Sequence, residues 1–145
     1  MGFAKRINDW LKRFFELDKY EFDKIIIEKE VIDAIVELAQ QTLPKEFIAF
    51  LEGKVKKSTL RIYRLNYQEY IANPSYTVYK MDFPIASDIV GTAHSHPGPS
   101  NRPSKADLQS FSKKGLVHLI IRMPYSSQTI QAYDMKGNAI SYEVG

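Results

Sequence analysis

Two histidines and an aspartate in the second half of the sequence have the spacing of metal ligands. His94 and His96 are separated by one residue, so in an extended strand their side chains lie on the same face and can reach one metal ion. Asp107 follows a loop rich in Gly and Pro and supplies a third, oxygen ligand. Two imidazoles and one carboxylate leave a tetrahedral position open for water, which is typical of a catalytic zinc site. We therefore predict that His94, His96 and Asp107 bind zinc.

The chain contains no cysteine, and this excludes several other kinds of site. A structural zinc site built from thiolates, a disulfide and a cysteine nucleophile are all ruled out. The third histidine, His118, lies in an apolar stretch without a second ligand beside it. We therefore interpret His118 as a structural residue.

Ser104 lies three residues before Asp107, a spacing that also has a purely structural interpretation. Ser-x-x-Asp at the start of a helix forms a capping box, in which each side chain accepts a hydrogen bond from the backbone of the other residue. A helix start also holds both side chains rigidly, as a metal site requires, so the two interpretations partly coexist. Because one carboxylate cannot bind zinc and fully cap the backbone, we expect the ligand role of Asp107 to prevail when metal is present.

These residues resemble the signature of the JAMM, or MPN+, metalloprotease family. That signature is His-(Ser/Thr)-His-Pro followed by Ser-x-x-Asp, with seven residues, the proline included, between the second His and the Ser. The chain matches it from His94 to Asp107, with residues 97–103 as the spacer. The resemblance extends roughly from Val31 to the C-terminus, and it implies one Zn²⁺ per chain.

A distant glutamate completes the family signature, in a segment of the form Pro-x-Glu-x-x-x-x-Leu-x-Gly. Glu46 matches it, between Pro44 and Gly53. The alternative for Glu46 is a solvated surface charge, but the residue adjoins an apolar run in which an unpaired carboxylate would be costly. Glu52 is the other nearby carboxylate, and we expect it at the surface.

The resemblance implies a mechanism and a class of substrate. Glu46 would act as general base, and Ser104 would donate a hydrogen bond to the oxyanion that forms during amide hydrolysis. The family cleaves amide or isopeptide bonds after the C-terminus of ubiquitin or ubiquitin-like β-grasp proteins. Compact prokaryotic members resemble this chain, so its implied partners are ubiquitin-like modifiers or sulfur-carrier proteins of the ThiS and MoaD type.

Length and composition are those of one globular domain. The chain has 145 residues, of which 44% are hydrophobic and 26% charged, and its net charge is +3. This mild basicity does not indicate nucleic acid binding. No apolar run approaches the ~20 residues of a membrane span, and the charged N-terminus is unlike a signal peptide. We therefore expect a cytoplasmic protein.

Hydrophobic periodicity predicts an α/β fold with a mixed sheet. Residues 1–24 are expected to form an amphipathic helical extension, and residues 25–145 the metalloprotease domain. Further helices are expected over 28–42 and 104–114, and strands over 47–55, 60–67, 76–81, 89–96, 116–123, 129–134 and 140–144. The resemblance implies that this sheet and its helices form an MPN-like, cytidine-deaminase-like single domain.

Two segments have interpretations that the sequence leaves open. The N-terminal helix is expected to pack against the domain; a dimer contact is the second interpretation and a membrane-surface helix the third. The polar and aromatic stretch 66–88 is the best candidate for binding the extended tail of a substrate by strand addition.

Two rival functions have a different chemical basis. A metal-free MPN scaffold would bind proteins without cleaving them, but the complete ligand set argues against it. The second rival function is a zinc hydrolase that acts on a small amide or nucleoside. Zinc deaminases of this kind use a Pro-Cys-x-x-Cys motif, which this chain lacks because it has no cysteine.

Overall fold

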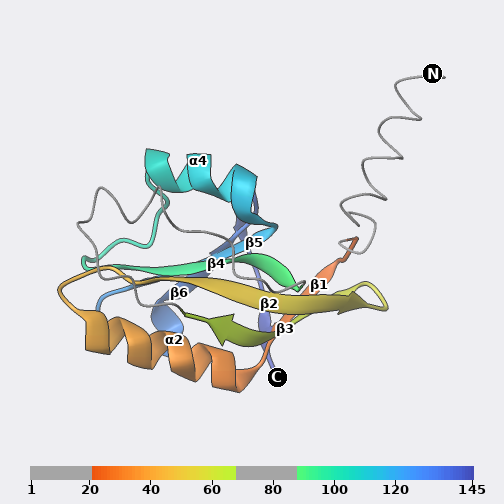
Figure 1. The fold of residues 1–145 in the computed structure, drawn as a ribbon, viewed down its shortest axis with the longest axis horizontal. Helices are drawn as coiled ribbons and strands as arrows, with labels where there is room; N and C mark the ends of the chain where they lie inside the picture. Colours follow the sequence, from red (N-terminus) through yellow and green to blue (C-terminus); the bar gives the residue numbers. More distant parts are fainter. Residues whose placement is uncertain (1–20, 68–87) are drawn as a thin grey trace.

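The computed structural model describes residues 21–67 and 88–145, which form a curled mixed sheet with helices on both faces (Figure 1). The helices are α2 (Lys29–Thr42), α4 (Lys105–Lys114) and a short 3₁₀ turn, η2 (Ser127–Thr129). The strands are β1 (Lys24–Ile27), β2 (Ile48–Lys56), β3 (Thr59–Asn66), β4 (Ile89–His96), β5 (Val117–Arg122), β6 (Ile130–Tyr133), β7 (Ala139–Ile140) and β8 (Glu143–Val144).

Within these residues the strand order is β7-β6-β5-β4-β2-β3-β1-β8. The pairs β1–β3, β1–β8 and β4–β5 are parallel, whereas β2–β3, β2–β4, β5–β6 and β6–β7 are antiparallel. The strands at the two ends of this order, β7 and β8, are separated in the chain only by Ser141 and Tyr142. The sheet must therefore curl until its two ends approach one another.

Helix α2 covers one face of the sheet with a stripe of apolar side chains spaced three and four residues apart. Its buried residues are Val31, Ile32, Ile35 and Ala39. They join the main hydrophobic core, to which β1 to β6 contribute Ile, Val, Leu and Ala side chains. The helix ends at Thr42, where Leu43 precedes Pro44 and adopts an extended conformation, as the residue before a proline prefers.

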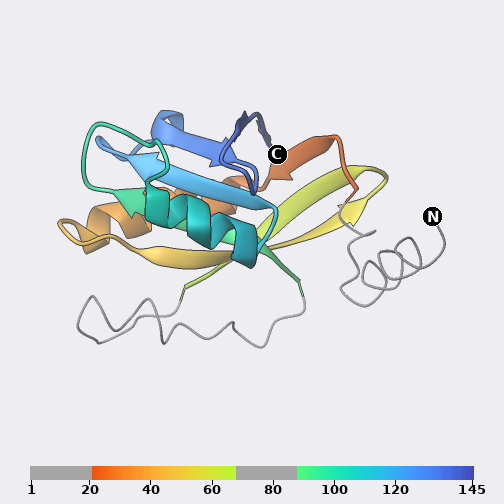
Figure 2. The same cartoon turned by 90° about the horizontal axis from the view of Figure 1, so that it is seen from above.

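Helix α4 covers the opposite face, over β4 and β5 (Figure 2). Its buried Phe111 packs with Ile120 of β5 and Tyr133 of β6 in a second, smaller core. The helix ends at Gly115, whose φ of 130° lies in a region that L-residues rarely adopt, and a Cβ there would approach the Val90 carbonyl oxygen to 2.5 Å.

The connection β4–α4–β5 positions the site. Strands β4 and β5 are parallel neighbours, so α4 must return the chain from the carboxyl end of β4 to the amino end of β5. This brings the last residues of β4, including His94 and His96, beside the N-terminus of α4. In sheets of this kind, ligands bind at the carboxyl ends of the strands.

The predicted helices over 28–42 and 104–114 and most predicted strands are confirmed, with ends that differ by one or two residues. The prediction of a single strand over 140–144 is wrong, because Ala139–Ile140 pairs with β6 while Glu143–Val144 pairs with β1. Tyr142 lies in the two-residue connection between β7 and β8, and its hydroxyl donates to the Ile130 carbonyl at 3.2 Å. The predicted helix before residue 21 and the strand near 76–81 lie outside the described residues.

The predicted domain boundary after residue 24 falls at the first residue of β1. Among the helices that the structure describes, none is long and apolar enough to cross a membrane.

Candidate metal centre

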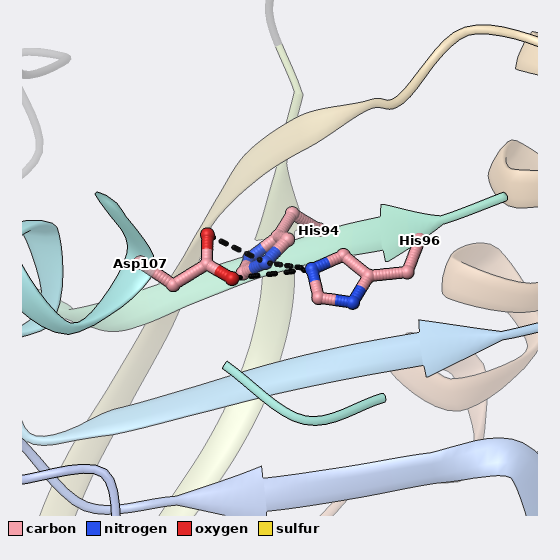
Figure 3. A group of neighbouring side chains, drawn as sticks. All are labelled: His94, His96 and Asp107. Carbon is pink, nitrogen blue, oxygen red and sulfur yellow. Dashed lines mark hydrogen bonds and ion pairs between the residues drawn. The ribbon is translucent and has the colours of Figure 1, made fainter. Parts of the chain in front are cut away.

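Figure 3 shows the side chains of His94, His96 and Asp107 converging on one point. The two Nε2 atoms are 3.2 Å apart. Asp107 Oδ1 lies 3.2 Å from His94 Nε2, and Oδ2 lies 3.2 Å from His96 Nε2. A tetrahedral zinc with bonds of about 2.0–2.1 Å places its ligand atoms roughly 3.3–3.4 Å apart. The separation of the two Nε2 atoms therefore fits a zinc ion, and with one oxygen of Asp107 the three ligand atoms lie within 4.8 Å of one another.

The hydrogen bond made by His96 orients its ring for metal binding. His96 Nδ1 lies 3.1 Å from the Ser100 carbonyl oxygen, which can only accept, so Nδ1 carries the hydrogen and donates. In the neutral ring Nε2 then presents its lone pair to the other two residues. Metal-binding histidines commonly donate their second N–H to a carbonyl in this way. Because that acceptor is a backbone atom, no residue type in the sequence predicted it.

The charges at this point favour binding of a cation. Burial acts to raise the pKa of Asp107, but the hydrogen bonds from His94 and His96 outweigh it, and the pKa falls well below its usual range. The hydrogen bond to Asp107 raises the pKa of His96, while burial opposes this rise. Asp107 is thus ionised, and a metal ion must compete with a proton for His96.

Ser104 and Asp107 form the predicted capping box at the start of α4. Asp107 Oδ2 accepts the Ser104 N–H at 2.8 Å, and Ser104 Oγ accepts the Asp107 N–H at 3.1 Å. We expected capping and metal binding to compete for Asp107. In the structure Oδ2 both accepts the Ser104 N–H and lies 3.2 Å from His96 Nε2, whereas Oδ1 faces His94 and takes no part in the cap.

Glu46 is exposed and lies in the segment between α2 and β2. Ile48 pairs with His94 across β2 and β4. Phe47, which precedes Ile48, is joined by two hydrogen bonds to Ser95, which follows His94. Ser95 Oγ accepts the Phe47 N–H at 3.0 Å, and the Ser95 N–H donates to the Phe47 carbonyl at 3.3 Å. One residue further, Glu46 follows as the neighbour of His96, and its negative charge contributes to the raised pKa of His96. Glu46 therefore lies at the rim of the site and not among its three converging ligands.

The expectation that Glu52 lies at the surface is wrong. Its exposed fraction is 4%, and its carboxylate lies 3.6 Å from Arg64 Nη1 on the neighbouring strand. Glu52 lies in β2, between β3 and β4, and is paired in register with Arg64 of β3.

His118 is a buried structural residue, as predicted. Its Nδ1 lies 2.7 Å from Thr92 Oγ1, and its Nε2 lies 3.1 Å from the Gly115 carbonyl oxygen. The ring stacks on Phe111 with centroids 4.1 Å apart and planes 5° apart. Burial lowers the pKa of His118 to about 4, so the ring is neutral near pH 7. Phe111 also contacts the His94 ring, at a centroid distance of 6.2 Å. His118 therefore packs against His94 indirectly, through Phe111.

The loop 97–103 is held by contacts that sequence reasoning missed. The Tyr133 hydroxyl donates to the Asn101 carbonyl at 2.6 Å, and the Asn101 side chain donates to the Thr129 carbonyl at 3.2 Å. The Met123 N–H donates to the Gly98 carbonyl at 3.0 Å. These bonds fix the connection between His96 and the N-terminus of α4. They join residues far apart in the chain, and no local pattern indicates them.

Comparisons with known proteins agree with this fold. The chain is 29% identical over 127 residues to a probable metalloprotease of Haloferax volcanii, a match that covers 81% of this chain and 78% of that protein. It is similar to the structure of a JAB1/MPN domain protein from Archaeoglobus fulgidus, with 32% identity, a TM-score of 0.64 and coverage of 81% of this chain and 96% of the other.

A second solved structure, described as JAMM, a metalloprotease-like zinc site in the proteasome and signalosome, is 31% identical with a TM-score of 0.64. That similarity covers 85% of this chain and 99% of the other. The family model for prokaryotic homologues of the JAB domain matches residues 28–136, which include Glu46 and every residue from His94 to Asp107. Because this match spans most of the sequence, the chain belongs to the family of prokaryotic JAB-domain proteins.

Proposed function

We propose that the protein is a zinc-dependent peptidase or isopeptidase that cleaves the amide bond after the C-terminus of ubiquitin-like β-grasp proteins. The observation that carries this proposal is the convergence of His94, His96 and Asp107 with the ligand separations of a tetrahedral zinc site. These three residues would hold one zinc ion per chain. Three protein ligands leave a position for water or substrate, as in catalytic zinc sites.

The residues around the ligands have the chemistry that amide hydrolysis needs. When bound, zinc would make water more acidic and polarise the carbonyl of the scissile bond. Glu46, at the rim beside His96, accepts the proton of the attacking water and delivers it to the leaving amine. The Ser104 hydroxyl accepts the Asp107 N–H and keeps its own hydrogen for donation to the carbonyl oxygen as negative charge develops there.

The substrate class rests on the family resemblance and on the relatives. One is named a probable metalloprotease, and a solved structure is described as JAMM, a metalloprotease-like zinc site in the proteasome and signalosome. Sulfur-carrier proteins and small ubiquitin-like modifiers share an extended C-terminal tail, and extended peptides bind to sheet edges by strand addition. The segment 66–88, most of which lies outside the described residues, is the proposed binding element for that tail.

The test is incubation of the zinc-loaded protein with fusions in which a β-grasp protein is joined through its C-terminus to a fluorescent reporter. We expect cleavage after the β-grasp C-terminus, loss of cleavage with a strong chelator and recovery with Zn²⁺. His96→Ala serves as the control, with less bound zinc after dialysis and no cleavage. Equal zinc content in His96→Ala and the wild type would contradict the proposed ligand set. A wild-type protein that retains zinc but cleaves no fusion would contradict the substrate class.

A further inference from the structure

Ser95 is a buried polar residue on a face of the sheet that is otherwise apolar around it. It lies between His94 and His96 in β4, and because side chains alternate along a strand it lies on the opposite face from both, the face that α2 covers. Ala93 and Ile121, on the same face, belong to the main hydrophobic core, and the exposed fraction of Ser95 is 0%. Buried hydroxyls need hydrogen-bond partners, so the contacts of Ser95 indicate why a polar residue is placed there.

The Ser95 side chain extends the pairing of β2 with β4 by one residue. Ile48, the first residue of β2, is in register with His94. At the next step the Ser95 N–H donates to the Phe47 carbonyl at 3.3 Å, as in a regular antiparallel pair. The reverse bond is different, because the Phe47 N–H donates at 3.0 Å to the Ser95 hydroxyl oxygen instead of the Ser95 carbonyl. Both backbone groups of Phe47 are thus fixed, and one of the two bonds depends on a side chain.

Glu46 depends on this anchor for its direction. Its side chain is exposed, so packing does not hold it, but the backbone is fixed on both sides. The Lys45 N–H donates to the Thr42 carbonyl at 2.8 Å and closes the turn after α2, and Ser95 fixes Phe47. The Phe47 side chain lies in the main core, so alternation places Glu46 on the opposite face, the one that carries the two histidine ligands.

We propose that Ser95 is a positioning residue for the general base. Its hydroxyl oxygen holds the Phe47 N–H, and Phe47 in turn holds Glu46 opposite His96 on the ligand face of the sheet. Because Ser95 lies on the core face, it acts only through the backbone of Phe47. This anchor is a property of the fold, and only its effect on turnover rests on the proposed function.

Amide hydrogen exchange of the zinc-free full-length protein tests the anchor without any substrate. Ser95→Ala removes the acceptor of the Phe47 N–H, whereas Ser95→Thr keeps a hydroxyl on the same Cβ. We expect the Phe47 amide to exchange at least about tenfold faster in Ser95→Ala and at nearly the wild-type rate in Ser95→Thr. The Ile120 amide, within β5, reports global unfolding in the same samples. A Phe47 rate that is unchanged in Ser95→Ala, or that rises only as much as the Ile120 rate, would overturn the proposal.

Turnover of a β-grasp reporter fusion supplies the second readout. We expect Ser95→Ala to lower kcat about 10–100-fold with KM and zinc content unchanged, and Ser95→Thr to restore most of the loss. In a Glu46→Gln background, Ser95→Ala should cause little further loss, because the residue that it positions no longer takes the proton. A Ser95→Ala protein with wild-type kcat, or one whose loss adds fully to that of Glu46→Gln, would contradict the positioning role.

Thr129→Val is the matched control. It removes another buried hydroxyl that accepts a backbone N–H, that of Ser126 at 2.9 Å, outside the ligand set. It should lower the urea midpoint, as Ser95→Ala does, but keep kcat near the wild-type value. An equal loss of kcat in Thr129→Val would show that turnover follows stability alone and would overturn the proposal. If the wild type cleaves no fusion, the proposed function fails and the exchange rates alone decide the anchor.

Discussion

Asp107 and Ser104 are joined by two reciprocal hydrogen bonds, and the same carboxylate faces both histidines of the site. Oδ2 accepts the Ser104 N–H at 2.8 Å while Oδ1 lies 3.2 Å from His94 Nε2. The capping box thus aims the carboxylate as well as stabilising the helix. A ligand mounted on a capped helix start has little rotamer freedom to lose when it binds a metal, and this is a form of preorganisation.

Asp107→Asn separates capping from metal binding. The amide oxygen of Asn can still accept the Ser104 N–H, so α4 and the fold should survive, with a loss of no more than the ~0.5–2 kcal/mol that caps are worth. The negative charge is lost, however, so zinc should bind far more weakly. The measurements are zinc content after dialysis and the free energy of unfolding of the zinc-free protein. Normal zinc content in Asp107→Asn would show that the carboxylate is not a ligand.

Glu46→Gln should retain fold and zinc but lose most turnover. Gln preserves the shape of Glu and its ability to accept a hydrogen bond, yet it cannot take a proton from water. General-base contributions are typically ~10²–10⁴-fold in rate. The measurement is kcat for a β-grasp reporter fusion, with zinc content determined on the same sample.

Glu52→Gln is the control for Glu46, although the structure changes what we expect from it. Because Glu52 is buried and paired with Arg64, its replacement should affect stability more than turnover. The general base would have been misassigned if Glu52→Gln were inactive while Glu46→Gln kept its kcat.

Acid should destabilise the protein through His118. Its pKa is lowered from about 6.5 to about 4 in the folded state, so below pH 6.5 the unfolded chain binds a proton that the folded chain does not. Stability therefore falls as the pH drops from about 6.5 to about 4, and this one group contributes roughly 3 kcal/mol to the loss.

The measurement for His118 is the free energy of unfolding of the zinc-free protein at pH 7 and pH 4.5, for wild type and for His118→Gln. Gln stays neutral and carries both a donor and an acceptor for Gly115 and Thr92. His118→Gln should lose less stability between the two pH values, because the other titrating groups are common to both proteins. An identical loss in the two proteins would contradict a buried neutral His118.

The local pattern of the sequence predicted the parts of the site that lie on regular elements. His94 and His96 share a face because strand side chains alternate, and Asp107 joins them because the helix between two parallel strands begins where the first strand ends. The remaining features depend on which segments meet in space. The bond from His96 to the Ser100 carbonyl, the burial of Glu52 and the bond from the Phe47 N–H to Ser95 all depend on tertiary neighbours, so no residue type or spacing predicts them.

The division of residues 140–144 between β7 and β8 has the same origin. Their alternation fits one strand, but β7 pairs with β6 and β8 pairs with β1, which lie next to opposite ends of the strand order. Only the curl of the whole sheet brings β6 and β1 close enough for β7 and β8, which pair with them, to be joined by two residues. A local pattern therefore could not distinguish one strand from two.

Ser104 is the residue for which the capping and catalytic interpretations give different results. Ser104→Ala removes the hydroxyl, which both interpretations require. If the hydroxyl only caps α4, stability falls by ~0.5–2 kcal/mol, and turnover per zinc-loaded molecule hardly changes. We expect instead that kcat falls ~10²–10³-fold with KM similar, because a donor to the oxyanion acts mainly in the transition state.

Ser104→Asp sharpens this contrast. An ionised carboxylate can accept the Asp107 N–H and cap the helix well, but it has no hydrogen to donate and would repel an oxyanion. We therefore expect a Ser104→Asp protein that is folded and nearly inactive. The measurements are the free energy of unfolding, zinc content and kcat, determined on the same preparation. Wild-type kcat with normal zinc content would reduce Ser104 to a helix cap, and stabilisation of the oxyanion would then have to come from the metal alone.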